Sequence, residues 1–317
     1  MLKRPKIAVI GAGNVGATCA HWLVAKELGD VVLLDIPEVA DQTRGKALDL
    51  YEATPIERLD CRITGTSDYD DLSNSDIVVL TAGSPRRPGM SRDDLIKVNA
   101  GIVAKVSNEI RARVPNCILI IMTNPLDAMV YAAWKASGFP PARIVGQAGC
   151  LDVARFKTFV SEETGYSVED INALLLGGHG DDMVPLPRFT NVGGIPVTEL
   201  MSLERLNELV ERTKGGGGEI VEMMGTSSYY AAAAAILQMV EAIIRDKKRI
   251  LPCAALCQGE YGVDGIFVGV PCVLGSGGVE KIIEVGLEAD ERAAFETSAN
   301  HVRELVEVVR TLFPELA

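Results

Sequence analysis

In the first half of the chain, short apolar runs alternate with longer segments that mix polar and apolar residues. The runs are rich in Val, Ile and Leu, and they predict strands at residues 6–10, 31–35, 62–66, 76–81 and 118–122. The intervening segments predict helices at residues 14–27, up to about 53, at 92–113 and from Pro125 onward. Strands that are apolar on both faces and separated by helices indicate a parallel sheet covered on both sides. The pattern therefore predicts an α/β fold, a doubly wound sheet of the Rossmann type.

The pattern changes near residue 146. Turn-rich strands are expected at residues 192–196 and 265–270, and long helices at 219–246 and from 290 to about 312. Four consecutive glycines at 215–218 stand between polar helical segments and predict a hinge or a helix break. We expect a first domain at residues 1–145 and a mixed α+β second domain at residues 146–317.

Composition and charge exclude several classes of function. The 317 residues include 31 Lys and Arg against 43 Asp and Glu, for a formal net charge of −12. A mean field of this sign repels phosphate, so we expect neither nucleic acid nor an anionic membrane surface as a partner. The N-terminal segment resembles no secretory signal, and the Ala-rich run at 231–240 is too short to cross a bilayer.

The seven cysteines point to a reducing compartment. Their number is odd, and their spacing matches neither a disulfide framework nor a zinc motif. We expect reduced and mostly buried thiols, no bound metal, and a cytoplasmic location.

A glycine-rich motif directly follows the first predicted strand and opens the first predicted helix. It consists of Gly11, Ala12, Gly13, Asn14, Val15 and Gly16, which match G-x-G-x-x-G. In this context the first glycine allows a tight turn, the second lets the backbone approach a pyrophosphate, and the third lets the helix pack on the strand. The helix N-terminus offers free N–H groups to the phosphates. The motif predicts a dinucleotide site within residues 1–145, although a purely structural glycine turn is the alternative.

Asp35 ends the second predicted strand, 19 residues after Gly16. A carboxylate at this place accepts hydrogen bonds from a ribose diol. It also repels a 2′-phosphate, and the neighbouring Ile36 supplies no compensating cation. Asp35 therefore predicts NAD rather than NADP, with a helix N-cap as the alternative interpretation.

Three arginines, Arg86, Arg87 and Arg92, lie within seven residues after the fourth predicted strand. In a chain of net negative charge, such a concentration at the carboxyl edge of a parallel sheet predicts an anionic ligand. Pro85, Pro88 and Gly89 bound the segment and suggest a lid over residues 82–91, whereas a solvated basic loop is the plain alternative.

Further candidates lie beyond the sheet. His179 stands between glycines after an apolar run at 173–176, which makes it a candidate catalytic base. Asp152 and Arg155 are three residues apart on a predicted helix and share a face, although such a pair is often an ordinary surface ion pair. The remaining histidines, His21 and His301, are interpreted as packing or surface residues.

Taken together, these motifs resemble the lactate/malate dehydrogenase family along essentially the full length, and more closely its malate dehydrogenases of the lactate-dehydrogenase-like type. The resemblance rests on GAGNVG at 11–16, TAGSPRRPGMSRDDL at 81–95, TNPLDAM at 123–129, LDVARF at 151–156 and GGHGDDMVPL at 177–186.

The resemblance implies roles for the polar candidates. His179 would be the acid/base, with Asp152 as its carboxylate partner. Arg155 would grip the carboxylate next to the reacting carbon, and Arg92 would polarise the carbonyl. Arg86 matches the position that discriminates malate from lactate, and Arg87 stands where Lys is common.

The resemblance also implies how cofactor and substrate are held. Asn124 would bind substrate, and the nicotinamide side would be lined by Asn99, Met122, Thr123 and Asn124. The implied cofactor is NAD, the implied substrate is the dicarboxylate pair malate and oxaloacetate, and the implied assembly is a homo-oligomer, dimer or tetramer. Alternatives are a lactate or other 2-hydroxyacid dehydrogenase, an NAD-using glycosidase, and a non-catalytic dinucleotide-binding protein.

Overall fold

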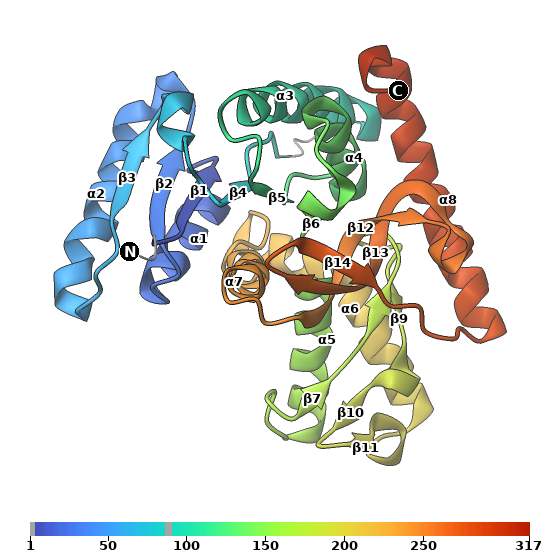
Figure 1. Cartoon of the computed structure of the whole chain (residues 1–317). Helices are drawn as coiled ribbons and strands as arrows, with labels where there is room; N and C mark the ends of the chain where they lie inside the picture. The colour runs from blue at the N-terminus through green and yellow to red at the C-terminus, as the bar shows by residue number, and fades with distance from the viewer. Residues whose placement is uncertain (1–3, 86–90) are drawn as a thin grey trace.

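One long sheet runs through the molecule (Figure 1). The computed structural model describes residues 4–85 and 91–317, without the side chain of Arg92, and in this part of the chain nine strands join in the order β14-β13-β12-β6-β5-β4-β1-β2-β3. The first six are β1 Lys6–Ile10, β2 Asp30–Leu34, β3 Ile63–Thr66, β4 Ile77–Leu80, β5 Ile118–Ile121 and β6 Ile144–Gly146. They are parallel in the order 3-2-1-4-5-6, which confirms the doubly wound Rossmann prediction.

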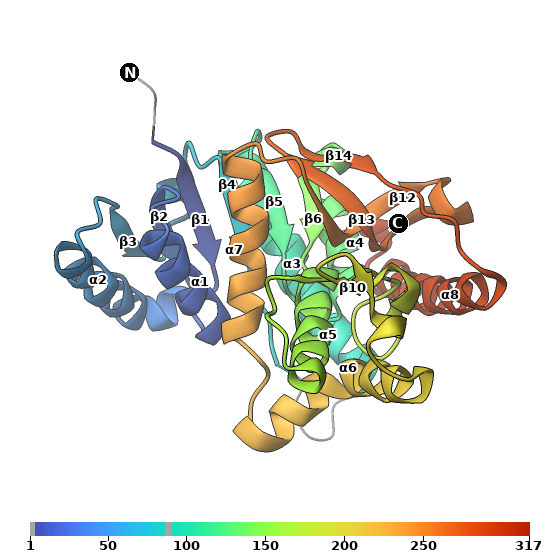
Figure 2. The ribbon, with the colours of Figure 1, turned by 90° about the horizontal axis from the view of Figure 1, so that it is seen from below.

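Helices cover both faces of this sheet. On one side lie α3, α4 and α8, and on the other lie α1, α5 and α7 (Figures 1 and 2). The helices are α1 Asn14–Ala25, α2 Ala40–Glu57, α3 Arg92–Arg113, α4 Leu126–Ser137, α5 Gly149–Thr164, α6 Leu203–Met224, α7 Tyr230–Ile244 and α8 Ala289–Leu312. Both faces of the parallel strands are therefore buried, which explains why β1, β4 and β5 are apolar at nearly every position. No helix among the described residues has both the length and the apolar character needed to cross a membrane.

The second half of the chain extends the same sheet. The strands β12 Arg249–Gln258, β13 Asp264–Gly275 and β14 Gly278–Ile282 are antiparallel, and β12 joins β6 where Ala254 pairs with Gly146. The predicted division at 145/146 thus falls inside β6, so the two halves share one sheet.

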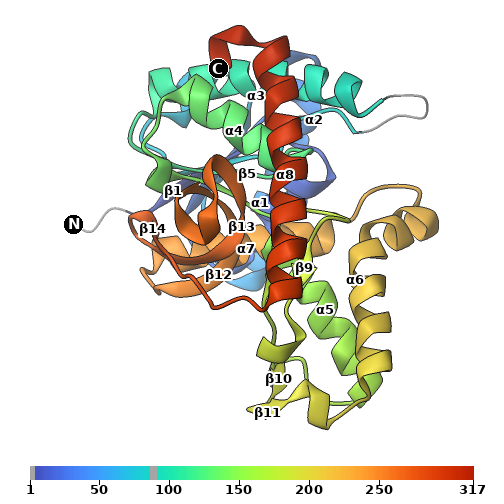
Figure 3. The same ribbon diagram turned by 90° about the vertical axis from the view of Figure 1, so that its right-hand side faces the viewer.

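A smaller lobe projects from this body (Figure 3). It combines α5 and α6 with the short strands β7 Ile171–Asn172, β10 Asn191–Val192 and β11 Ile195–Pro196. The lobe has its own apolar core, formed by Phe156, Phe159, Val160, Ile171, Val192, Val197, Leu206 and Leu209. Between body and lobe, β8 Leu175–Leu176 pairs with β9 Val184–Pro185.

The predicted helix break at 215–218 is wrong, because α6 continues through all four glycines to Met224. The single predicted helix over 219–246 is also wrong, because it is divided between α6 and α7. The chain leaves α6 at Gly225, whose φ of 68° is left-handed and therefore suits glycine. α6 packs on α5, and tertiary packing of this kind stabilises helical geometry that glycine by itself disfavours. The predicted strand at 192–196 is likewise a hairpin, with Gly193 and Gly194 at positive φ in its turn.

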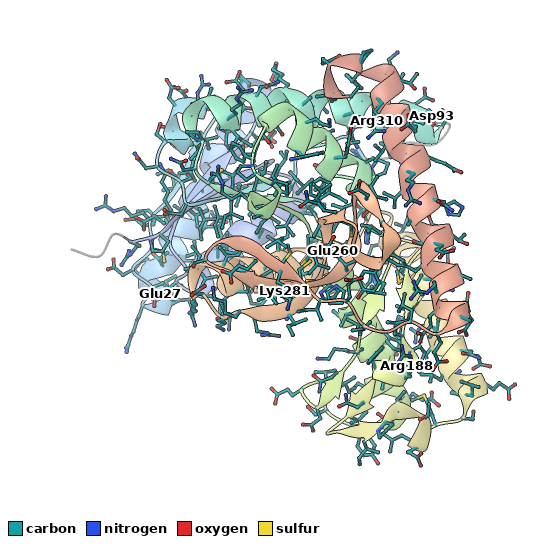
Figure 4. All side chains as sticks on the ribbon, turned by 45° about the vertical axis from the view of Figure 1, so that its right-hand side comes forward. Glu27, Asp93, Arg188, Glu260, Lys281 and Arg310 are labelled. Atoms are coloured by element: carbon teal, nitrogen blue, oxygen red, sulfur yellow. The ribbon has the colours of Figure 1, made fainter. Side chains whose placement is uncertain are left out.

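Polar contacts near both ends of α8 tie this long helix to the rest of the chain. Figure 4 labels two of the residues involved, Arg188 and Arg310. Near its start, Arg188 donates from Nε to Oε1 of Glu291 at 2.8 Å. Near its end, Arg310 donates from Nε to the hydroxyl of Tyr131 on α4 at 2.9 Å. The helix is thereby held across the sheet, next to the segment that contains His179.

Candidate active site

The glycine motif forms the turn between β1 and α1. Gly11 has a φ of 103°, and a Cβ on Gly16 would overlap the carbonyl oxygen of Gly11, so both positions need glycine. At Gly13, in contrast, a Cβ would meet nothing within 4 Å. Gly13 is also the N-cap of α1, where no side chain caps the helix and no acidic residue stands in the first turn. The turn therefore leaves open space in front of N–H groups that suit an anion.

Asp35 lies immediately beside this turn. Its Oδ2 accepts from the backbone N of Ala12 at 2.6 Å, and its Oδ1 accepts from the backbone N of Ile36 at 2.8 Å. The N-cap of the following short helix is Ile36, so Asp35 is not the helix cap of the alternative interpretation. Lys46 on α2, to which the sequence pattern assigned no role, donates from Nζ to the carbonyl oxygen of Ala12 at 2.5 Å. Asn14 is exposed and Val15 half-buried in the first turn of α1.

Asn99 connects the loops that follow β4 and β5. Its Oδ1 accepts from the backbone N of Ser84 at 2.7 Å, and its Nδ2 donates to the carbonyl oxygens of Ser84 at 3.1 Å and Asn124 at 2.6 Å. Thr123 adds a hydrogen bond from its hydroxyl to the carbonyl oxygen of Ala82 at 2.7 Å. Met122 is half-buried, and the side chain of Asn124 is exposed. The contact of Asn99 with a cofactor stays a prediction, and what the geometry adds is a bracing function for its amide.

Asp152, Arg155 and His179 meet in one cluster. Nδ1 of His179 lies 2.8 Å from Oδ2 of Asp152, and NH1 of Arg155 donates to Oδ1 of the same carboxylate at 3.0 Å. Asp152 is 1% exposed, and the side chains of His179 and Arg155 are 13% and 15% exposed. The surface ion pair that the spacing alone allowed is therefore excluded. Asp152 and Arg155 come from the first two turns of α5, whereas His179 follows β8 between two glycines with positive φ, Gly177 and Gly180.

The electrostatics of this cluster suit proton transfer. Burial disfavours the charged imidazole, but the charge of Asp152 and its hydrogen bond to Nδ1 outweigh that effect, so the pKa of His179 is raised above its ordinary value. The bond to Asp152 leaves Nε2 as the ring nitrogen available to a substrate.

The glycines of α6 pack against the side chain of Arg155. A Cβ on Gly216 would lie 3.2 Å from Cδ of Arg155, and a Cβ on Gly217 would lie 3.9 Å from NH2. On Gly215 or Gly218, a Cβ would meet nothing within 4 Å. Gly216 and Gly217 thus leave room for the arginine side chain, whereas Gly215 and Gly218 do not contact it.

Asp127, at the start of α4, belongs to the same region although the sequence pattern gave it no role. It is 3% exposed, and its Oδ2 accepts from the backbone N of His179 at 3.0 Å. Its Oδ1 is buried and has no hydrogen-bond partner among the described residues. Burial raises the pKa of Asp127 to about 6, although the hydrogen bond from His179 acts in the opposite direction. An Asp in the first turn of a helix is ordinarily explained by its favourable interaction with the helix dipole. For that reason the sequence pattern showed no sign of a further role for Asp127.

The arginine-rich segment is only partly described. Arg86 and Arg87 lie outside the described residues, as does half of the predicted lid at 82–91, namely residues 86–90. Arg92 is the first residue of α3, and the structure does not describe its side chain. The start of α3 is fixed by a capping box between Ser91 and Asp94, in which each side chain bonds the other's backbone N.

The other two histidines lie apart from this cluster. His301 on α8 has its Nδ1 2.8 Å from Oδ1 of Asp182, a partner that the sequence pattern did not indicate. His21 on α1 lies against Trp22, with ring centroids 5.8 Å apart. Across residues 4–85 and 91–317, no group of three or more His, Cys, Asp or Glu side chains is arranged to hold a metal ion.

Two family models match consecutive parts of the chain. A family model for the NAD-binding domain of lactate/malate dehydrogenases matches residues 5–146, and one for their α/β C-terminal domain matches residues 150–312. A relative from Rhodopirellula baltica, named malate dehydrogenase, is 59% identical over 99% of this chain and 100% of its own length.

Solved structures give the same result. The malate dehydrogenase of Salinibacter ruber is 51% identical, with a TM-score of 0.93 over 98% of this chain and 99% of its own. A lactate dehydrogenase of Cryptosporidium parvum, solved with lactic acid and nicotinamide adenine dinucleotide, is 39% identical, with a TM-score of 0.94 over 98% of this chain and 99% of its own. Both similarities cover the smaller lobe as well as the sheet.

Proposed function

This chain belongs to the lactate/malate dehydrogenase family, and on that premise we propose that the cluster of His179, Asp152 and Arg155 is its active site. The reaction is the reversible oxidation of (S)-malate by NAD⁺, which gives oxaloacetate, NADH and a proton. The observation that carries the proposal is the buried Asp152 carboxylate, which contacts the imidazole with one oxygen and the guanidinium with the other.

The residues around the glycine turn fit the cofactor. The open space at Gly13 lies in front of the uncapped N-terminus of α1 and suits a pyrophosphate. The carboxylate of Asp35 keeps further lone pairs for a ribose diol, and its charge disfavours a 2′-phosphate. The loops braced by Asn99, which include Met122, Thr123 and Asn124, would line the nicotinamide side. When bound, NAD⁺ accepts the hydride from the carbinol carbon of malate.

The protein supplies the proton chemistry and the charges. Nε2 of neutral His179 takes the hydroxyl proton of malate, and the imidazolium that forms is stabilised by Asp152. In the reverse direction the imidazolium returns the proton to the carbonyl oxygen. Arg92 would place positive charge beside that oxygen, where negative charge develops.

Charge counting supports the dicarboxylate. Arg155 can bind one carboxylate of malate bidentately, which orients the substrate as well as holding it. The second carboxylate needs its own cation, and Arg86 is the residue we assign to it, with Asn124 as a further hydrogen-bond donor to substrate.

A comparison of two keto acids tests this function. We expect the purified chain to oxidise NADH with oxaloacetate at a kcat/KM at least about 10³ times that with pyruvate, because pyruvate leaves one arginine desolvated without a partner. The measurement is the loss of NADH absorbance with each acid at saturating cofactor. Equal activity on both acids would instead favour a general 2-hydroxyacid dehydrogenase, and no activity on either would favour a non-catalytic dinucleotide-binding protein.

Substitution of Gly216 by Ala is expected to weaken substrate binding while leaving the fold intact. The new Cβ would press on Cδ of Arg155 and displace the guanidinium, so the KM for oxaloacetate should rise about tenfold or more. The KM for NADH should not change. Gly215→Ala and Gly218→Ala are the matched controls, because they leave Arg155 untouched and should each stabilise the helix by up to ~1 kcal/mol in thermal unfolding. A rise in KM for oxaloacetate in all three variants would contradict the assignment to Arg155.

We also propose a homo-oligomer, a dimer or a tetramer. The support is the set of exposed large apolar side chains on α2, which are Leu48, Tyr51 and Ile56. A cytoplasmic location is supported by the seven cysteines, which are all free and buried. The two family-model matches support the division into an NAD-binding domain at 1–145 and a substrate-binding domain at 146–317.

A further inference from the structure

A second carboxylate is buried against the catalytic histidine. Oδ2 of Asp127 on α4 accepts a hydrogen bond from the backbone N of His179, while Oδ1 is buried without a partner among the described residues. The backbone amides of His179 and of Asp127 itself stabilise the charged carboxylate, but burial outweighs both effects. Anchoring the segment that contains His179 explains one oxygen of Asp127, but it does not explain why the second carboxylate oxygen is buried there with no partner in the described part of the chain.

The charges of the buried cluster explain the burial of Asp127. Asp127 and Asp152 contribute two negative charges, and Arg155 contributes one positive charge. With neutral His179 the cluster carries a net charge of −1, and with the imidazolium it is neutral. In a poorly solvated environment, the neutral arrangement is favoured over the charged one.

We propose that Asp127 is a positioning residue that holds the backbone of His179 in place and, through its negative charge, favours the protonated imidazole. This inference rests on the proposed function, in which His179 exchanges a proton with the substrate. Asp152 binds the ring directly, whereas Asp127 acts on it through space and through the peptide N–H. Neutralising Asp127 and neutralising Asp152 therefore have different consequences. Both changes remove a negative charge near the imidazole, but only the loss of Asp152 also removes the hydrogen-bond partner of Nδ1.

Other charged and titratable groups face this site from the elements packed around it. From α5 come Asp152 and Arg155, and both contribute to the electrostatics of His179. From the segment that carries His179 comes Asp182, which is paired with His301 of α8 rather than with the cluster. A second contact from α8 is neutral, since the hydroxyl of Ser298 accepts from the backbone N of Gly178 at 2.8 Å. The pKa of Asp127, raised to about 6 by burial, places its titration close to that of an imidazole.

The test is the Asp127→Asn variant, whose amide oxygen can still accept from the backbone N of His179. We expect the pKa of the His179 imidazole to fall by on the order of one unit, because the variant lacks the negative charge that stabilises the imidazolium. The measurement is an NMR pH titration with ¹³C-labelled histidine, in which His21→Gln and His301→Gln variants assign the three resonances. Asp182→Asn is the matched control, since it removes a carboxylate from the same segment but not from the cluster.

The kinetic consequence has a definite sign. Malate oxidation needs the neutral imidazole and oxaloacetate reduction needs the imidazolium, so both pH profiles of kcat/KM should move to lower pH in Asp127→Asn. A residue that only anchors the loop would change activity or stability without moving these profiles. An imidazole titration in Asp127→Asn that coincides with that of the unmodified chain would overturn the proposal.

The unmodified chain provides a second measurement should Asp127→Asn not fold. Because protonation of Asp127 and of His179 oppose each other, the His179 titration should be broader than a single-site curve, with a Hill slope below one. A single-site curve would count against the proposal. The NMR titration measures protonation of the imidazole and does not depend on enzyme activity. A chain that shows the coupling between Asp127 and His179 but no activity on oxaloacetate would therefore refute the proposed function and not this inference.

Discussion

Replacement of Asp152 by Asn is expected to reduce kcat by roughly 10³- to 10⁴-fold, which is the scale seen when a buried carboxylate partner of a catalytic histidine is neutralised. The amide keeps the size of the side chain but cannot stabilise the imidazolium. It can also donate to Nδ1, which would place the proton on Nε2 in the neutral ring and block acceptance of the substrate proton. The same change removes the ion pair that holds Arg155, so the KM for oxaloacetate should rise as well.

The measurement is steady-state kinetics in both directions, with NADH binding followed separately. Asp182→Asn is a close control, because its carboxylate lies at the same 2.8 Å from a histidine Nδ1 but outside the cluster. We expect that variant to keep kcat within a small factor of the unmodified chain. A loss of less than tenfold in Asp152→Asn would show that this carboxylate does not support proton transfer.

Replacement of Arg86 by Gln is expected to lower kcat/KM for oxaloacetate by about 10³-fold or more and to raise the ratio of activity on pyruvate to activity on oxaloacetate. In the proposed site Arg155 neutralises one carboxylate, so the other is left without a cation when Arg86 is removed. An unpaired charge in a closed site costs several kcal/mol, and ~1.4 kcal/mol corresponds to a tenfold change in rate.

Arg87→Gln is the matched control for this change, because the neighbouring arginine carries the same charge in the same segment. We expect it to alter kcat/KM for oxaloacetate much less than Arg86→Gln does. Should Arg87→Gln produce the larger loss, the distal carboxylate is bound by Arg87 and the assignment of Arg86 is wrong. Both variants are assayed with oxaloacetate and pyruvate at the same NADH concentration.

The sequence alone predicted the parallel sheet and the glycine turn. Strands buried on both faces must be continuously apolar, so β1, β4 and β5 appear in the sequence without reference to the rest of the fold. The turn is largely local, because the positive φ of Gly11 and the overlap between a Cβ on Gly16 and the carbonyl oxygen of Gly11 arise within six residues of chain. The close approach of Thr81 and Ala82 to Gly11 is the part that depends on the neighbouring strand β4. Asp35 follows from the same βαβ unit. For these features, a short segment contains most of the physical requirement.

Only the tertiary structure decided the rest of the candidate site. Asp152 and Arg155 share a face of any regular helix, but their burial depends on the packing of α5 against β12 and α6. The glycines of α6 indicated a break locally, whereas the packing of α6 on α5 keeps them helical and two of them make room for Arg155. Asp127 shows the difference most clearly. Its contact with His179 spans 52 residues of chain, and its desolvation comes from surroundings that no local pattern encodes. Local sequence determines backbone conformation and the face that a side chain occupies, but burial and charge balance are sums over residues that only the folded chain brings together.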